Sequence, residues 1–84
     1  MAWCVVKDNL ENKDVLVVGP SSTPLQAHEI IHTGTKFRMY DDDNELYYEG
    51  YSTEEDFSPL DDYGMPNAGC TSIEYLIHEK WVRI

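Results

Sequence analysis

The chain has 84 residues, of which 42% are hydrophobic and 26% are charged. A chain of this length has room for a single domain with one core, so a two-domain enzyme is excluded, and its apolar content is too high for a disordered segment. Sixteen acidic residues against six basic ones give a net charge of −10, which repels phosphate backbones and anionic lipid headgroups. Direct binding to nucleic acid or to a membrane surface is therefore not expected.

The cysteines and the N-terminus indicate the compartment. No stretch approaches the roughly 18 apolar residues of a membrane span, and the first residues lack the basic start and apolar run of a signal peptide. We therefore expect a cytoplasmic protein. Cys4 and Cys70 are the two cysteines, too few for a disulfide scaffold. They are interpreted as buried free thiols, with a mutual disulfide as the alternative, and no cofactor is expected.

The first half of the chain predicts a hairpin and a helix. Residues 3–7 and 14–18 are rich in β-branched side chains and are predicted as strands joined by a polar loop. Gly19 and Pro20 end the second strand. The helix signals that follow are Thr23 as N-cap, Pro24 at the first position, Gln26 as capping-box partner and Gly34 as the stop. Its expected buried stripe is Ala27, Ile30 and Ile31.

A second hairpin is predicted from residues 35–40 and 45–51, which flank the turn residues 41–44. A turn centred between Asp42 and Asp43 sets the cross-strand pairs. The expected pairs are Met39 with Leu46 and Phe37 with Tyr48 on the core face, and Arg38 with Tyr47 and Lys36 with Glu49 on the solvent face.

The last third of the chain predicts a loop and a third hairpin. Residues 52–70 hold several glycines and prolines and are predicted as a long loop with one helical turn near Glu54. Residues 71–77 and 80–84 form the hairpin, turning at His78 and Glu79, with Glu74 opposite Arg83. Its core face is expected to hold Ile73, Tyr75, Ile77, Val82 and Ile84.

Together these elements predict an α+β fold. A strongly bent antiparallel sheet or partial barrel of about six short strands packs against one short helix.

The sequence His28-Glu29-Ile30-Ile31-His32 matches the H-E-x-x-H pattern, in which two histidines on one helix face bind zinc and the glutamate polarises water. The helix is short, and Arg38 stands where a third histidine ligand is expected. We therefore favour an ordinary amphipathic helix and keep a minimal zinc-dependent hydrolase, built on His28, Glu29 and His32, as the alternative.

Asp41, Asp43 and Glu45 alternate like the start of a calcium-binding loop. Leu46 stands where that loop needs its glycine, and Ser52 stands where it needs its bidentate glutamate. The interpretation is a solvated turn whose aspartates form local hydrogen bonds.

Acidic residues are concentrated in one part of the chain. Residues 41–62 hold ten of the sixteen acids and no base, interleaved with Tyr47, Tyr48, Tyr51 and Phe57 and followed directly by Tyr63. Such a surface combines long-range attraction for a basic protein with aromatic anchors, although the tyrosines could also simply cover the sheet. The predicted partner-binding residues are Asp41, Asp42, Asp43, Tyr47, Glu54, Glu55, Asp56, Asp61 and Asp62.

Three stretches carry a resemblance: FRMYDDD at residues 37–43, LYYEG at 46–50 and PLDDYGMPNAGCT at 59–71. In these stretches the sequence resembles small uncharacterised acidic proteins carried by phages and conjugative elements. The resemblance implies a protein that blocks a nucleic-acid-binding protein of its host, in some cases by imitating the charge of DNA, and it supplies no catalytic residues.

The sequence therefore predicts a non-enzymatic cytoplasmic inhibitor or DNA mimic. Its expected partner is a basic host protein that acts in defence or DNA processing, while the oligomeric state stays open. The alternatives are the zinc hydrolase and a structural or accessory subunit that assembles through the apolar faces of its edge strands.

Overall fold

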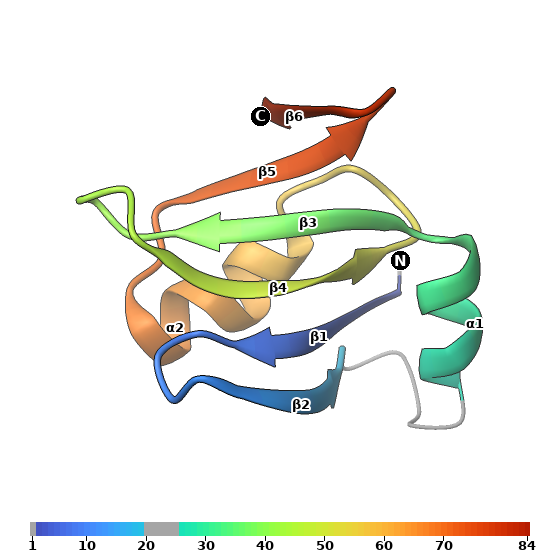
Figure 1. The fold of residues 1–84 in the computed structure, drawn as a ribbon, viewed down its shortest axis with the longest axis horizontal. Helices are drawn as coiled ribbons and strands as arrows, with labels where there is room; N and C mark the ends of the chain where they lie inside the picture. The colour runs from blue at the N-terminus through green and yellow to red at the C-terminus, as the bar shows by residue number, and fades with distance from the viewer. Residues whose placement is uncertain (1, 20–25) are drawn as a thin grey trace.

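The computed structural model describes residues 2–19 and 26–84 (Figure 1). These residues form six strands: β1 (Trp3–Asp8), β2 (Lys13–Val18), β3 (Thr35–Tyr40), β4 (Leu46–Ser52), β5 (Ser72–Ile77) and β6 (Lys80–Arg83). All neighbouring strands are antiparallel, in the order β2-β1-β4-β3-β5-β6. The α+β fold is confirmed, and the sheet is open, with β2 and β6 as its edges.

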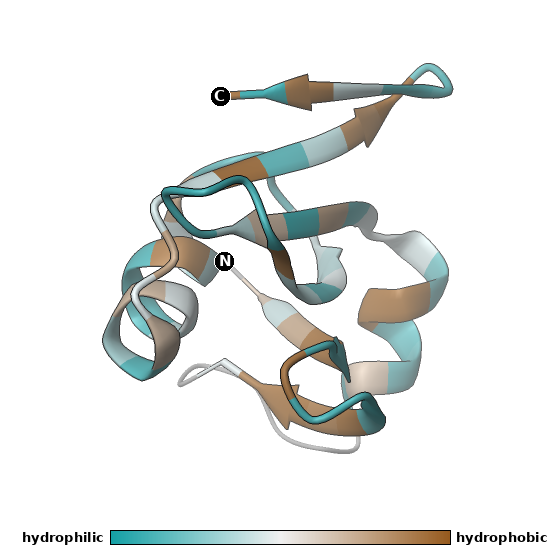
Figure 2. Ribbon diagram, turned by 60° about the vertical axis from the view of Figure 1, so that its left-hand side comes forward, coloured by the Kyte–Doolittle hydropathy of each residue, from teal (hydrophilic) through white to brown (hydrophobic). Residues whose placement is uncertain are grey.

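Helical segments lie on both faces of the sheet. The helix α1 (Ala27–Thr33) lies on one face beside β1 and β4, and the π-helical turn η2 (Leu60–Gly64) continues into α2 (Met65–Ala68) on the other (Figures 1 and 2). No described helix has the length and apolar character needed to cross a bilayer.

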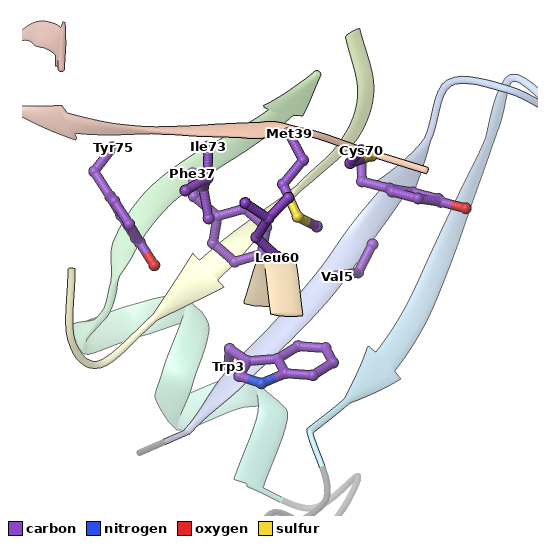
Figure 3. Packing of buried hydrophobic residues seen from close by; sticks show 9 residues of the cluster. Trp3, Val5, Phe37, Met39, Leu60, Cys70, Ile73 and Tyr75 are labelled. Atoms are coloured by element: carbon purple, nitrogen blue, oxygen red, sulfur yellow. The ribbon is translucent and has the colours of Figure 1, made fainter. Parts of the chain in front are cut away.

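The core lies between the sheet and the η2–α2 segment (Figure 3). Strand alternation places Phe37 and Met39 of β3 on this face, where both are fully buried. The remaining members of the cluster are Trp3, Val5, Tyr48, Leu60, Cys70, Ile73 and Tyr75. Cys4 and Cys70 are buried free thiols, as predicted.

The prediction of a long loop over residues 52–70 is wrong, because η2 and α2 occupy its second half. The loop was predicted from the glycines and prolines of this stretch, which include Pro59, Pro66 and Gly69. The structure places Pro59 as the N-cap of η2, Pro66 in the first turn of α2, and Gly69 after its end with φ at 70°. Proline at a helix start and left-handed glycine at its end are helix boundary signals.

The predicted helix stripe is partly wrong. Ala27 and Ile30 are buried, but Ile31 is 38% exposed, because a seven-residue helix turns only a narrow stripe toward the sheet. Gln26 is the N-cap residue and makes no side-chain capping bond. Thr23, Pro24 and Pro20 lie outside the described residues.

The strands of the second hairpin are confirmed, but its register is wrong. Met39 pairs with Tyr48 and Tyr40 pairs with Leu46, so Tyr47 is an extra residue that forms a β-bulge. Between the bulge and the start of β3, each β3 residue pairs with a β4 residue two positions later than predicted. This even displacement leaves Phe37, Met39 and Tyr48 on the core face. Glu49 therefore faces Arg38, and Lys36 faces Tyr51.

The third hairpin has the predicted turn and the predicted pair of Glu74 with Arg83. Val82 and Ile84 lie across from Tyr75 and Ile73 on the core face as predicted, but they are not buried there and are 41% and 40% exposed. They lie at and just beyond an edge strand that contributes no residue to the buried cluster.

The turn of this hairpin leads to a first prediction. His78 and Glu79 both have positive φ, 50° and 66°, the geometry of a two-residue type I′ turn that favours Asn-Gly. Replacing the pair by His78→Asn and Glu79→Gly should raise the free energy of unfolding by about 1 kcal/mol, because side chains are strained at positive φ. Urea denaturation measures this, and an unchanged or lower stability would contradict the turn geometry.

A second prediction concerns alkaline pH. Burial raises the pKa of Tyr48 and Tyr75 to about 12, from 10.0, and that of Cys70 to about 11, from 9.0. Folding therefore favours the neutral forms. Their stabilising contribution is fully present below about pH 9 and is lost as the pH rises toward 12. We expect denaturation midpoints to fall over this window, with a smaller fall for Tyr48→Phe. Stability that stays constant from about pH 8 to 11 would contradict the burial of these groups.

Candidate functional site: the acidic end of the sheet

The predicted partner-binding residues do not form one surface. Asp41, Asp42 and Asp43 precede β4, whereas Glu54, Glu55 and Asp56 follow it, so the length of a seven-residue strand separates the two groups. Asp61 and Asp62 are exposed on η2, on the core side of the sheet. A run of acids that is continuous in the sequence is thus divided among three places in the fold.

The structure instead joins residues 41–49 to a part of the chain that the sequence analysis did not single out. The backbone N–H of Asn9, in the β1–β2 turn, donates to the Tyr47 carbonyl at 2.8 Å. The Asn9 side-chain amide also donates to Glu49 Oε2 at 3.1 Å. These bonds hold the β1–β2 turn against the start of β4, at the same end of the sheet as the β3–β4 turn. In Figure 2 both turns come toward the viewer as largely hydrophilic loops.

We call this end of the sheet the acidic turn surface. It consists of residues 7–14 and 41–49, which contain eight acids and two lysines. The acids are Asp8, Glu11, Asp14, Asp41, Asp42, Asp43, Glu45 and Glu49. Lys13 contacts Glu11 at 2.8 Å, and Lys7 lies 3.7 Å from Asp14. Both lysines therefore lie within the first hairpin, and no base lies in residues 41–49.

Asp41 has a structural role in this surface. Its carboxylate accepts hydrogen bonds from the backbone N–H groups of Asp43 and Glu45, both at 2.9 Å. The bond from Glu45 is the main cause that lowers the pKa of Asp41, and the Tyr47 hydroxyl also bonds to this carboxylate. The interpretation as a turn with local hydrogen bonds is thus confirmed. Asp42, Asp43 and Glu45 are exposed around it and free of that role.

Of the two tyrosines in residues 41–49, Tyr47 is the one that reaches the surface. It is half-buried, packs against the edge of the core cluster, and its hydrogen bond to Asp41 raises its pKa. The other aromatic residues of the acidic stretch are divided. Tyr48 is buried, Tyr63 is half-buried against Tyr48 at 5.0 Å between ring centroids, and Phe57 is 48% exposed.

Asp56 also serves the local backbone. Its carboxylate accepts from the N–H of Ser58 at 2.9 Å, and its carbonyl accepts from the Tyr75 hydroxyl at 2.8 Å. These bonds tie the segment that leads into η2 to the core. Glu54 and Glu55 are exposed beside it.

The H-E-x-x-H residues lie on α1, and His28, Glu29 and His32 are all exposed. Within residues 2–19 and 26–84, no group of three or more His, Cys, Asp or Glu side chains is arranged to hold a metal ion. An open pocket of about 200 Å³ lies beside the helix, and neither histidine lines it. Its lining residues are Ala2, Gln26, Glu29, Ile30, Thr33 and Thr53.

On the outer face of β3, β5 and β6, two arginines surround one glutamate. Glu74 lies 3.6 Å from Arg38 and 3.2 Å from Arg83. The Arg38 guanidinium stacks on the Trp81 ring, 3.6 Å from its centroid, and not on Tyr47 as the predicted register required. This network joins three strands, so we assign it a structural role.

No protein-family model, no curated protein and no solved structure matches this chain.

Proposed function

We propose that the chain is a non-enzymatic cytoplasmic binding protein whose acidic turn surface occupies a basic, nucleic-acid-binding site on a host protein. One observation carries this proposal. The β1–β2 turn, which Asn9 bonds to β4, and the β3–β4 turn lie at the same end of the sheet and together hold eight acids against two lysines. A concentrated field of one sign attracts an oppositely charged partner over about a Debye length and speeds association.

The proposed interface includes only some of the residues predicted from the sequence and adds residues of the first hairpin. Asp42, Asp43, Glu45 and Tyr47 form its centre, and Asp8, Glu11, Asp14 and Glu49 extend it onto the first hairpin. The groups at Glu54, Glu55, Asp61 and Asp62 lie elsewhere and serve as internal controls.

The test captures proteins from a lysate of the native host on the tagged chain. A triple variant, Asp42→Asn with Asp43→Asn and Glu45→Gln, removes three exposed charges and leaves the Asp41 hydrogen bonds in place. Its control, Glu54→Gln with Glu55→Gln, removes charges at the other end of β4. We expect the wild type and the control to retain the same basic protein, and the triple variant to lose it.

Competition identifies the kind of site that is occupied. Because the proposed site on the partner binds nucleic acid, a double-stranded DNA fragment should displace the captured protein. Retention of the same proteins by the triple variant, or capture that DNA does not affect, would contradict the proposal.

A further inference from the structure

The pocket beside α1 lies at the end of the sheet away from the acidic turn surface. It is formed by residues of α1 together with Ala2, which precedes β1, and Thr53, which follows β4 (Figure 1). Its volume is about 200 Å³. A cavity of about 150 Å³ is enough for a molecule of the size of benzene, so a small organic ligand fits this pocket.

The hydroxyl hydrogens of the two threonines that line the pocket are already used within the chain. The Thr33 hydroxyl donates to the Glu29 carbonyl at 2.8 Å, one turn back along α1. The Thr53 hydroxyl donates to the Ala2 carbonyl at 3.2 Å, and its oxygen accepts from the Ala2 N–H at 3.1 Å. A hydroxyl that has donated its one hydrogen can only accept further bonds. The two threonines therefore offer a ligand lone pairs and no donor.

Glu29 gives the pocket a negative charge. Within residues 2–19 and 26–84 its carboxylate forms no ion pair, and no basic residue is among the described residues that line the pocket. Ile30, which is only 3% exposed, and Ala2 add apolar surface beside the carboxylate. The described lining thus combines one carboxylate and two hydroxyl oxygens with a small apolar area.

We propose that this pocket binds a primary alkylammonium ion, supplied by a free diamine or by a lysine side chain. An ammonium group is a compact cation with three N–H donors and no acceptor, so it complements a carboxylate beside hydroxyl oxygens. Its alkyl chain contacts Ile30 and Ala2. An anion would be repelled by Glu29 and would find both threonine donors occupied. The inference does not rest on the proposed function, because the pocket and the acidic turn surface lie at opposite ends of β1 and β4.

Titration followed by NMR tests the ligand class. The probes are putrescine and a lysine blocked at both ends, in about 150 mM salt to screen general attraction to the acidic chain. The backbone amide resonances of Ile30, Thr33 and Thr53 should shift with a dissociation constant in roughly the millimolar range. Tetramethylammonium carries the charge without N–H donors and should bind at least about tenfold more weakly. The tighter of the two ammonium probes identifies the source of the ligand.

Matched variants test the residues. Glu29→Gln removes the carboxylate, keeps the backbone bond from Thr33, and should weaken binding of both ammonium probes about tenfold. Its control, Asp62→Asn on η2, removes one exposed charge on the other face of the sheet and should leave binding unchanged. Circular dichroism confirms that each variant is folded. Equal binding of tetramethylammonium, equal losses for the two variants, or no shift at Ile30, Thr33 and Thr53 would overturn the proposal.

Discussion

Gly50→Ala is expected to lower the free energy of unfolding by about 3 kcal/mol or more. A methyl group at this buried position of β4 would collide with the carbonyl oxygen of Cys4 on β1 and would come within 2.7 Å of Phe37 Cζ. Backbone of a central strand cannot move aside as a flexible side chain can. The close approach accompanies the bulge in β1 between Val5 and Lys7, where the pairing with β4 shifts.

Gly69→Ala is the matched control for Gly50→Ala. Gly69 has φ at 70° and no neighbouring atom within 4 Å of an added methyl group, so its replacement costs only the left-handed strain, about 1 kcal/mol. Chemical denaturation of both variants gives the comparison. Similar losses for the two would contradict the tight contact of β1 with β4.

Tyr48→Ala is expected to cost about 3 to 4 kcal/mol, because it removes a ring that is only 4% exposed and its edge-to-face contact with Tyr63. A domain of this size has only about 5 to 10 kcal/mol of stability, so the variant should be partly unfolded at moderate temperature. Tyr48→Phe keeps the ring and should cost less than about 1 kcal/mol. Thermal melts distinguish the two, and a fully stable Tyr48→Ala would contradict the assigned core.

The strands were predictable from local pattern. β-branched runs and alternation of apolar with polar side chains identify residues of all three hairpins, and the inward direction of Tyr48 follows from the same alternation. The predicted inward direction of Tyr48 is correct although the predicted register is wrong. The pairing is displaced by two residues, and a displacement by an even number keeps each side chain on its face.

The register itself depends on a feature without a sequence signal. Asp41 closes a wide turn through two backbone hydrogen bonds, and Tyr47 bulges out of the ladder. A turn of four polar residues is compatible with either geometry. The helical segment after Pro59 was missed for a different reason, since its boundary residues were interpreted as interruptions rather than as a start and an end.

The candidate site was predictable only in part. Residues 41–43 belong to an acidic surface as expected, but the strand between them and Glu54 separates two groups that the sequence places close together. Asp8, Glu11 and Asp14 join the surface because β1 pairs with β4, a contact between segments about forty residues apart. Long-range strand pairing of this kind leaves no local pattern in one sequence.

Association kinetics with the captured host protein test the central claim most directly. The rate constant for association is measured between roughly 50 and 500 mM salt for the wild type, the Asp42/Asp43/Glu45 variant and the Glu54/Glu55 control. We predict that association of the wild type and the control slows steeply with salt. The triple variant should associate more slowly at low salt and show a flatter dependence, with smaller changes in dissociation. Association that is insensitive both to salt and to the three charges would contradict electrostatic docking through the acidic turn surface.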